Sequence, residues 1–177
     1  MASENARVLT VDVGNTVTNF GVFALDGGAP TRRGDETGGT ELAGSCGLAT
    51  LERPTVDDIR IQLAHAFTLL PAVDGCGCIL SCVVPALTDT WQQALQKVTG
   101  ARPLVVGPGL KNGVPMRYDD PSEIGPDRVA DVVAARAAYG SPAVVVDLGT
   151  TTNFEVIDQK GAFAGGIIAP SAALGAR

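Results

Sequence analysis

The sequence has little of what several functional classes require. Its 177 residues include one histidine and one tryptophan, and 13 basic residues stand against 19 acidic ones, for a net charge of −6. A nucleic-acid surface normally needs a basic stripe, so we expect no nucleic-acid partner. The single histidine, His65, lies in the apolar segment IQLAHAFTLL, where we interpret it as a helix residue rather than a ligand or a base.

Long apolar runs are absent as well. No run approaches the roughly 18 residues of a membrane span, and the start MASENARV has neither the basic nor the apolar part of a signal peptide. We therefore expect a cytoplasmic protein with no membrane partner. The four cysteines, Cys46, Cys76, Cys78 and Cys82, match neither common zinc spacing, and three lie in or beside CGCILSCVV, which favours small buried thiols.

What the sequence does contain is an internal repeat within a globular composition of 45% hydrophobic residues. Residues 8–23 read VLTVDVGNTVTNFGVF and residues 143–158 read AVVVDLGTTTNFEVID. At a fixed offset of 135, Val11, Asp12, Gly14 and Thr16 meet identical residues. Each copy is typical of a hairpin with an aspartate at the end of its first strand, so the repeat indicates a duplicated domain with one acidic turn per half.

Between the copies, helical and strand patterns alternate, which favours an α/β fold. We expect helices at Pro54–Leu70, Leu87–Val98 and Arg128–Tyr139. We expect strands at Cys78–Val84, ended by Pro85, and at Arg102–Val106 and Ala162–Ile168, with a loop at Pro108–Asp120. The stretch Gly27–Thr50 is rich in glycine, threonine and polar residues and is expected to be irregular.

The two acidic turns have the chemistry of a phosphate site. In Asp12-Val-Gly-Asn-Thr16, glycine permits a close approach, turn amides with Asn15 and Thr16 can donate to phosphate oxygens, and Asp12 can hold Mg²⁺ or a metal-bound water. The turn Asp147-Leu-Gly-Thr-Thr-Thr152 offers the same groups. Two such turns facing each other would clamp a triphosphate.

A third element, Gly125-Pro-Asp-Arg128, opens a helix, with Pro126 suited to the first helical position. An ionised Asp127 beside an arginine can accept a proton from a substrate hydroxyl while Arg128 faces anionic groups. Alternatively, Asp127 only stabilises the start of the helix, and the motif alone favours that simpler interpretation.

The strings DVGNT, LSCVVPALT, RYDDPSEIGPDR, VVDLGTTT and GGIIAPS together resemble the type III pantothenate kinases in order and approximate spacing. The resemblance covers residues 7–26 and 77–177. It implies an α/β fold of duplicated ribonuclease H-like halves with mixed β-sheets, of the actin-like ATPase type. Because the family continues beyond Arg177, it also implies an incomplete second half. We expect residues 1–124 to form the first half, with the phosphate hairpin, and residues 125–177 to form a linking helix and the start of the second.

The resemblance also implies an activity, the phosphorylation of the pantothenate hydroxyl by ATP with Mg²⁺. It assigns Asp127 as the proton acceptor, Asp147 as the ligand of a monovalent cation (K⁺ or NH₄⁺), and a homodimer as the assembly. The implied ATP-binding residues are Asp12, Val13, Gly14, Asn15, Thr16, Val17, Thr18, Asn19 and Thr150. The implied pantothenate-binding residues are Tyr118, Gly125, Pro126, Asp127 and Arg128.

Three alternatives remain at this stage. The chain could be a non-catalytic or truncated paralogue that serves as a binding or regulatory module. It could phosphorylate another small hydroxylated metabolite through nearly the same residues. An actin-type structural protein is the third, and there the GPDR string would have no purpose.

Overall fold

The computed structural model describes residues 6–25, 40–107, 109–117, 120 and 124–171. By packing, the described residues up to Val106 form a first unit and those from Gly107 onward form a second. The predicted boundary between halves, at residues 124 and 125, stays a prediction, since packing groups residues without showing which segment was duplicated.

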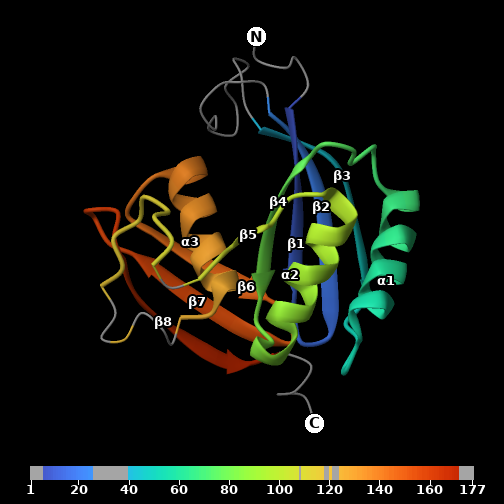
Figure 1. Ribbon diagram of the computed structural model, residues 1–177. Coiled ribbons are helices and arrows are strands. Elements are labelled where there is room, and N and C mark those ends of the chain that lie inside the picture. Colours follow the sequence, from blue (N-terminus) through green and yellow to red (C-terminus); the bar gives the residue numbers. More distant parts are fainter. Residues whose placement is uncertain (1–5, 26–39, 108, 118–119, 121–123, 172–177) are drawn as a thin grey trace. The chain divides into compact units, whose positions relative to one another are not determined.

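The first unit is built on a five-stranded mixed sheet (Figure 1). The strand order is β3-β2-β1-β4-β5, with β1 antiparallel to β2, β2 antiparallel to β3, and β1, β4 and β5 running parallel. The strands are β1 (Ala6–Val13), β2 (Val17–Leu25), β3 (Thr40–Ala49), β4 (Gly77–Cys82) and β5 (Leu104–Val105). The first predicted hairpin and both predicted strands of this unit are thus confirmed.

Two helices, α1 (Val56–Leu69) and α2 (Pro85–Thr99), cover one face of this sheet, and the hydrophobic core lies between them and the strands. Thr55 begins α1 with a capping box, since its side chain accepts from the Asp58 amide and the Asp58 carboxylate accepts from the Thr55 amide. The core is apolar and consists of Leu9, Val11, Val13, Phe20, Val22, Leu80, Ile59, Leu63, Ala66, Leu87, Trp91, Ala94 and Leu95, with three cysteines. Both helices were predicted, although α2 begins directly at Pro85 rather than two residues later.

The expectation of irregular chain at Gly27–Thr50 is wrong for Thr40–Ala49, which forms the edge strand β3. Its sequence, TELAGSCGLA, has a single β-branched residue, Thr40, and no aromatic residue, so it lacks the composition that marks a strand. Backbone pairing along the whole of β2 imposes the extended conformation instead. The rest of the segment, residues 27–39, lies outside the described residues.

The second unit has a three-stranded antiparallel sheet in the order β6-β7-β8, with one described helix, α3 (Pro126–Tyr139), on one face (Figure 1). Its strands are β6 (Ala143–Leu148), β7 (Thr151–Ile157) and β8 (Phe163–Pro170), close to the predictions. The preceding loop is tied to β8, because the Arg117 amide donates to the Phe163 carbonyl and the Phe163 amide to the Pro115 carbonyl. No helix among the described residues is long and apolar enough to cross a membrane.

Strand register extends the repeat beyond what the sequence comparison found. Asp12 pairs with Asn19 across the first hairpin, and Asp147 pairs with Asn153 across the second. Three residues connect β1 to β2, but only two connect β6 to β7. Because the second turn is one residue shorter, Thr-Asn-Phe at 18–20 corresponds to Thr-Asn-Phe at 152–154, a match that a fixed offset hides.

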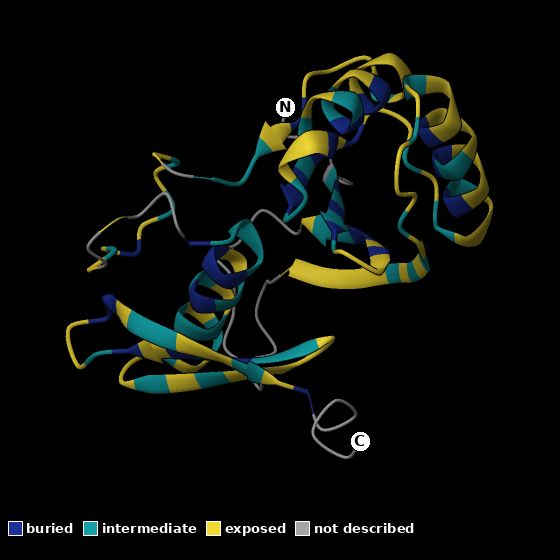
Figure 2. Ribbon diagram, turned by 90° about the horizontal axis from the view of Figure 1, so that it is seen from below, coloured by how far each residue is buried: buried dark blue, intermediate teal, exposed yellow. Residues whose placement is uncertain are grey.

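The two copies of the hairpin are covered on opposite faces. In the first unit, α1 and α2 bury the face that carries Leu9, Val11, Phe20 and Val22. The corresponding face of the second unit is open, with Val144 62%, Val146 50% and Val156 41% exposed, and Ile167 of β8 67% exposed (Figure 2). Helix α3 packs on the other face, against the buried residues Asn153, Glu155 and Ile157.

Candidate functional site

The first acidic turn is a three-residue connection, Gly14-Asn15-Thr16, that closes on itself. The Gly14 amide donates to the carbonyl of Val17 over 3.1 Å. A Cβ at position 14 would lie 2.8 Å from that carbonyl oxygen, so the turn requires glycine here. The side chains of Asn15 and Thr16 are exposed at its tip, where a phosphate could reach them.

Thr50, which sequence reasoning left in an irregular segment, fastens this turn from the end of β3. Its hydroxyl donates to the Gly14 carbonyl over 2.8 Å and lies 2.9 Å from the Thr18 hydroxyl, while its amide donates to the Thr16 carbonyl over 2.9 Å. Thr18 is fully buried. A single threonine therefore ties together three of the residues predicted to surround the phosphates.

Asp12 is oriented from a neighbouring parallel strand. The buried Ser81 lies opposite Asp12 in the pairing of β1 with β4, and its hydroxyl donates to Asp12 Oδ1 over 2.8 Å. This hydrogen bond fixes the direction of the carboxylate that was predicted to hold Mg²⁺. Nothing local in LSCVVP marks Ser81 for this role, since the contact spans 69 residues.

The remaining residues predicted at the first turn differ in exposure, and their part in nucleotide binding stays a prediction. Asp12 and Gly14 are half-buried, Val13 and Thr18 are buried, and Asn15, Thr16, Val17 and Asn19 are exposed.

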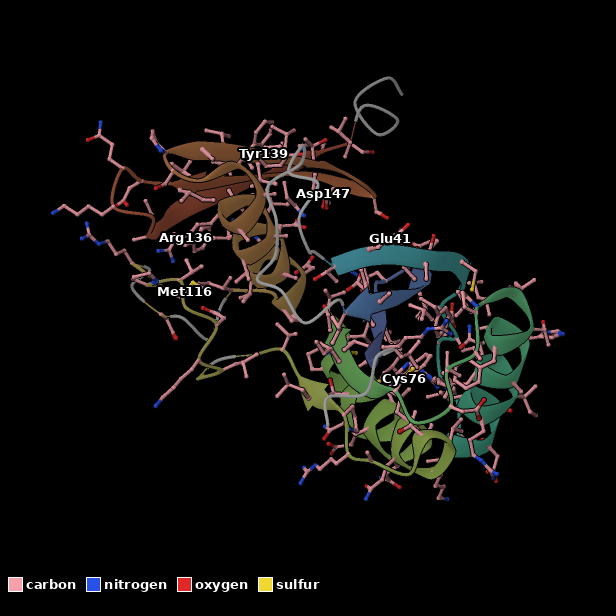
Figure 3. All side chains as sticks on the ribbon, turned by 90° about the horizontal axis from the view of Figure 1, so that it is seen from above. Glu41, Cys76, Met116, Arg136, Tyr139 and Asp147 are labelled. Atoms are coloured by element: carbon pink, nitrogen blue, oxygen red, sulfur yellow. The ribbon has the colours of Figure 1, made fainter. Side chains whose placement is uncertain are left out.

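The second acidic turn is tighter. The Gly149 amide donates to the Thr151 carbonyl over 2.9 Å, which leaves Gly149 and Thr150 exposed at the tip. Asp147, at the end of β6, is also exposed and is labelled in Figure 3. The Thr151 hydroxyl donates to Asn153 Oδ1 over 3.1 Å, so the asparagine opposite Asp147 is itself held in place.

The GPDR string begins α3 as predicted, with Gly125 as the N-cap residue and Pro126 as the first helical residue. No side-chain hydrogen bond caps this end of the helix. The Asp127 carboxylate instead lies against Gly125, where a Cβ would collide with Asp127 Oδ1. Glycine thus makes room for the carboxylate. Tyr118 lies outside the described residues.

Arg128 is buried with a partner that the sequence did not suggest. Its Nε donates to Glu155 Oε1 over 2.9 Å, and its guanidinium carbon lies 5.7 Å from the centre of the Phe163 ring. Arg128 is 6% exposed and Glu155 is fully buried. Gly166, which pairs with Glu155, also allows the close approach, because a Cβ there would collide with Arg128 Nη2.

Electrostatics show that the acidic residues of the second unit lie near one another. Burial raises the pKa of the Glu155 carboxyl, and the Arg128 guanidinium opposes this through its hydrogen bond and its charge. The carboxylates of Asp147 and Asp127 raise the pKa of Glu155 further. The charges of the predicted base, Asp127, and of the predicted cation ligand, Asp147, therefore both act on the buried partner of Arg128.

Among the residues that the structure describes, no group of three or more His, Cys, Asp or Glu side chains could hold a metal ion. Mg²⁺ in kinases is usually held by one or two carboxylates together with substrate phosphates and water, and Asp12 fits that pattern. The four cysteines are free thiols, and burial raises the pKa of the Cys78 thiol to about 12. Three of them are buried as predicted, and His65 lies on α1, as a helix residue.

Comparison with known proteins agrees with this architecture. A type II Ppx/GppA phosphatase from Aquifex aeolicus superposes with a TM-score of 0.52 over 93% of this chain and 52% of its own, at 13% identity, which shows the fold alone. The predicted α/β fold of the actin-like type is confirmed.

Proteins found by sequence comparison have a higher sequence identity to this chain. The type III pantothenate kinase of Moorella thermoacetica is 39% identical over 92% of this chain and 59% of its own length. That of Koribacter versatilis is 38% identical over 96% of this chain and 61% of its own. The chain thus spans about three-fifths of the length of these curated relatives. Because the family described as type III pantothenate kinase matches residues 8–177, the chain belongs to that family.

Proposed function

We propose that this chain carries the phosphate turn, the base and the substrate helix of an enzyme that transfers the γ-phosphoryl group of ATP to the hydroxyl of pantothenate. The product would be 4′-phosphopantothenate, in the first step of coenzyme A biosynthesis. The observation that carries the proposal is the grouping of Asp127, Arg128 and Asp147 on one helix start and one strand end, in a member of this kinase family.

The first turn is proposed to hold the phosphates of ATP. Gly14 brings the backbone close, and the exposed side chains of Asn15 and Thr16 donate to phosphate oxygens. Thr50 and the buried Thr18 keep the turn closed before ATP arrives, which lowers the entropy cost of binding. Mg²⁺ held by Asp12 and the phosphates would neutralise phosphate charge during transfer.

Asp127 is proposed as the general base. Its carboxylate accepts the proton of the pantothenate hydroxyl as that oxygen bonds to the γ-phosphorus, and the bond from the γ-phosphorus to the bridging oxygen breaks to release ADP. Gly125 leaves space for the carboxylate, and Pro126 fixes the start of the helix. Tyr118 and Arg128 are proposed to orient pantothenate.

The second turn is proposed to contact ATP through Thr150 and to hold a monovalent cation at Asp147. Both residues are exposed at the end of the β6–β7 hairpin, and the carboxylate of Asp147 is a hard oxygen ligand suited to K⁺. K⁺ at that position would supply positive charge beside the phosphates. The predicted homodimer is a proposal that rests on the family resemblance, and the cytoplasmic location stays a proposal as well.

The test is a coupled assay of ADP formation with pantothenate, with pantothenate lacking its primary hydroxyl, and with several similar alcohols. It is run on this chain and on a version extended to the length of the relatives. We expect ADP formation to require pantothenate and its hydroxyl. Faster turnover with another alcohol would make that alcohol the proposed substrate in place of pantothenate. A lack of turnover with every alcohol in both versions would support a binding module instead.

A further inference from the structure

The buried ion pair between Arg128 and Glu155 joins the first turn of α3 to the middle strand of the second sheet. Glu155 is flanked on that sheet by Val145 of β6 and Gly166 of β8. Because Gly166 has no side chain, the guanidinium lies directly over the strands, above the ring of Phe163. This is the deepest charged contact that the described part of the chain makes, since both partners are almost fully buried.

As a device for stability alone, this pair is poorly built. Moving two charges out of water is costly, and the cost is recovered only when every polar atom finds a partner. Here Arg128 Nη2 and Glu155 Oε2 are both buried, and neither has a hydrogen-bond partner among the residues that the structure describes. A well-packed apolar pair of the same volume would serve the core at least as well.

The repeat shows that the fold itself does not require this acid. By strand register, Thr152, Asn153 and Phe154 correspond to Thr18, Asn19 and Phe20, so the position of Glu155 corresponds to that of Gly21 in the first unit. The first hairpin forms the same strands with no charge at that position. The acidic side chain is present only in the hairpin that packs against α3, which indicates that Glu155 has a role connected with that helix.

The residue next to Arg128 is the proposed base. Asp127 lies in the first turn of α3, and no side-chain hydrogen bond caps that end of the helix. The turn is held against the sheet by the ion pair of Arg128, beside the buried Val129. We propose that Glu155 is a positioning residue that, through Arg128, fixes the first turn of α3 and with it the carboxylate of Asp127. This inference rests on the proposed function, in which that carboxylate accepts the substrate proton.

The test compares Glu155→Gln with Glu41→Gln, the same chemical change at an exposed position of β3 in the first unit (Figure 3). Glutamine keeps the shape of Glu155 but leaves Arg128 without its counter-ion. Misplacing a reacting group costs on the order of 10- to 100-fold in rate, so kcat for pantothenate phosphorylation should fall by about that factor in Glu155→Gln. The KM for ATP should be nearly unchanged, and Glu41→Gln should match the parent.

A second readout needs no activity. In a ¹⁵N-labelled protein, the buried Nε–H of Arg128 should give a slowly exchanging NMR signal, as should the backbone amides of the first turn of α3. Both should exchange faster in Glu155→Gln and remain as in the parent in Glu41→Gln. A residue that served stability alone would lower the melting temperature but leave kcat of the folded protein unchanged well below that temperature.

Each outcome decides the inference. Unchanged kcat in folded Glu155→Gln overturns it while leaving the proposed function intact. If neither this chain nor the version extended to the length of its relatives shows pantothenate-dependent turnover, the proposed function fails. Unchanged exchange at the first turn of α3 in Glu155→Gln would then overturn the inference as well, whereas faster exchange would support it. If Glu155→Gln does not fold, Glu155→Asp is used instead, because it keeps the charge but shortens the side chain by one methylene and moves the carboxylate away from Arg128. A parental kcat in that variant also overturns the inference.

Discussion

Thr50→Val tests whether the end of β3 holds the first acidic turn closed. Valine has the shape of threonine, so packing is preserved and only the hydroxyl is lost. That hydroxyl donates to the Gly14 carbonyl over 2.8 Å and lies 2.9 Å from the hydroxyl of Thr18. Because the Thr50 hydroxyl has one proton and donates it to the Gly14 carbonyl, the Thr18 hydroxyl is the donor in the second contact.

The expected loss follows from counting these partners. Each hydrogen bond contributes about 1 kcal/mol net, and a buried hydroxyl left without a partner costs about 1–3 kcal/mol. Thr18 is fully buried, so water cannot replace Thr50 there. We therefore expect the free energy of unfolding to fall by about 2–4 kcal/mol, a large part of the roughly 5–15 kcal/mol of a typical domain. A loosened turn should also bind ATP about tenfold or more weakly, since 1.4 kcal/mol corresponds to a factor of ten.

Urea unfolding gives the first quantity and titration with a non-hydrolysable ATP analogue gives the second. Thr50→Ser keeps the hydroxyl and should restore most of both. Thr40→Val makes the same change at the exposed beginning of β3 and should shift stability by less than about 0.5 kcal/mol. If Thr50→Val proved as stable and as tight in binding as the parent, the turn would be closed by its backbone alone.

Four further outcomes are expected. Asp127→Asn should cut turnover by roughly 10² to 10⁴ with the melting temperature unchanged, and a variant that keeps parental kcat would return Asp127 to a helix-start role. Activity should depend on K⁺ or NH₄⁺ and fall in Na⁺ alone through Asp147, and equal rates in the three salts would remove Asp147 from that role. The Cys78 thiol, with a pKa of about 12, should resist alkylation at pH 8 in folded protein and react after unfolding, as mapped by mass spectrometry. The open apolar face of the second sheet should make this chain self-associate, and Val146→Thr with Ile167→Thr should reduce that association in sizing experiments, whereas an unchanged size would show that this face does not drive it.

Local signals were enough to predict most of the elements. The β-branched runs around DVGNT and DLGTT predicted both hairpins, and Pro126 correctly marked the start of α3. The strand β3 was missed because residues such as Gly44 and Gly47 carry no strand preference of their own. Its conformation comes from pairing with β2, which is information that a local pattern does not contain.

The predicted candidate site was limited in the same way. The residues that are proposed to touch phosphate or substrate stand in short recognisable strings, so they could be proposed from the sequence. The residues that hold them do not: Ser81 meets Asp12 across 69 residues, Thr50 meets Gly14 across 36, and Glu155 meets Arg128 across 27. A buried glutamate inside an apolar strand is the one signal that could have been noticed, since such a charge is almost never buried without a partner.

The repeat and the placement of α3 together explain why the second hairpin differs from the first. In each hairpin the acidic residue and its paired asparagine lie on one face of the sheet, as Asp12 with Asn19 and Asp147 with Asn153. In the first unit the helices bury the opposite, apolar face, whereas α3 packs on the face that carries Asp147. The beginning of α3 therefore brings Asp127 to the same side of the sheet as Asp147, although the two residues are 20 positions apart in the chain. The charges of both aspartates act on the buried Glu155, and the fold supplies the compensating cation there in Arg128, whose Nε donates to Glu155.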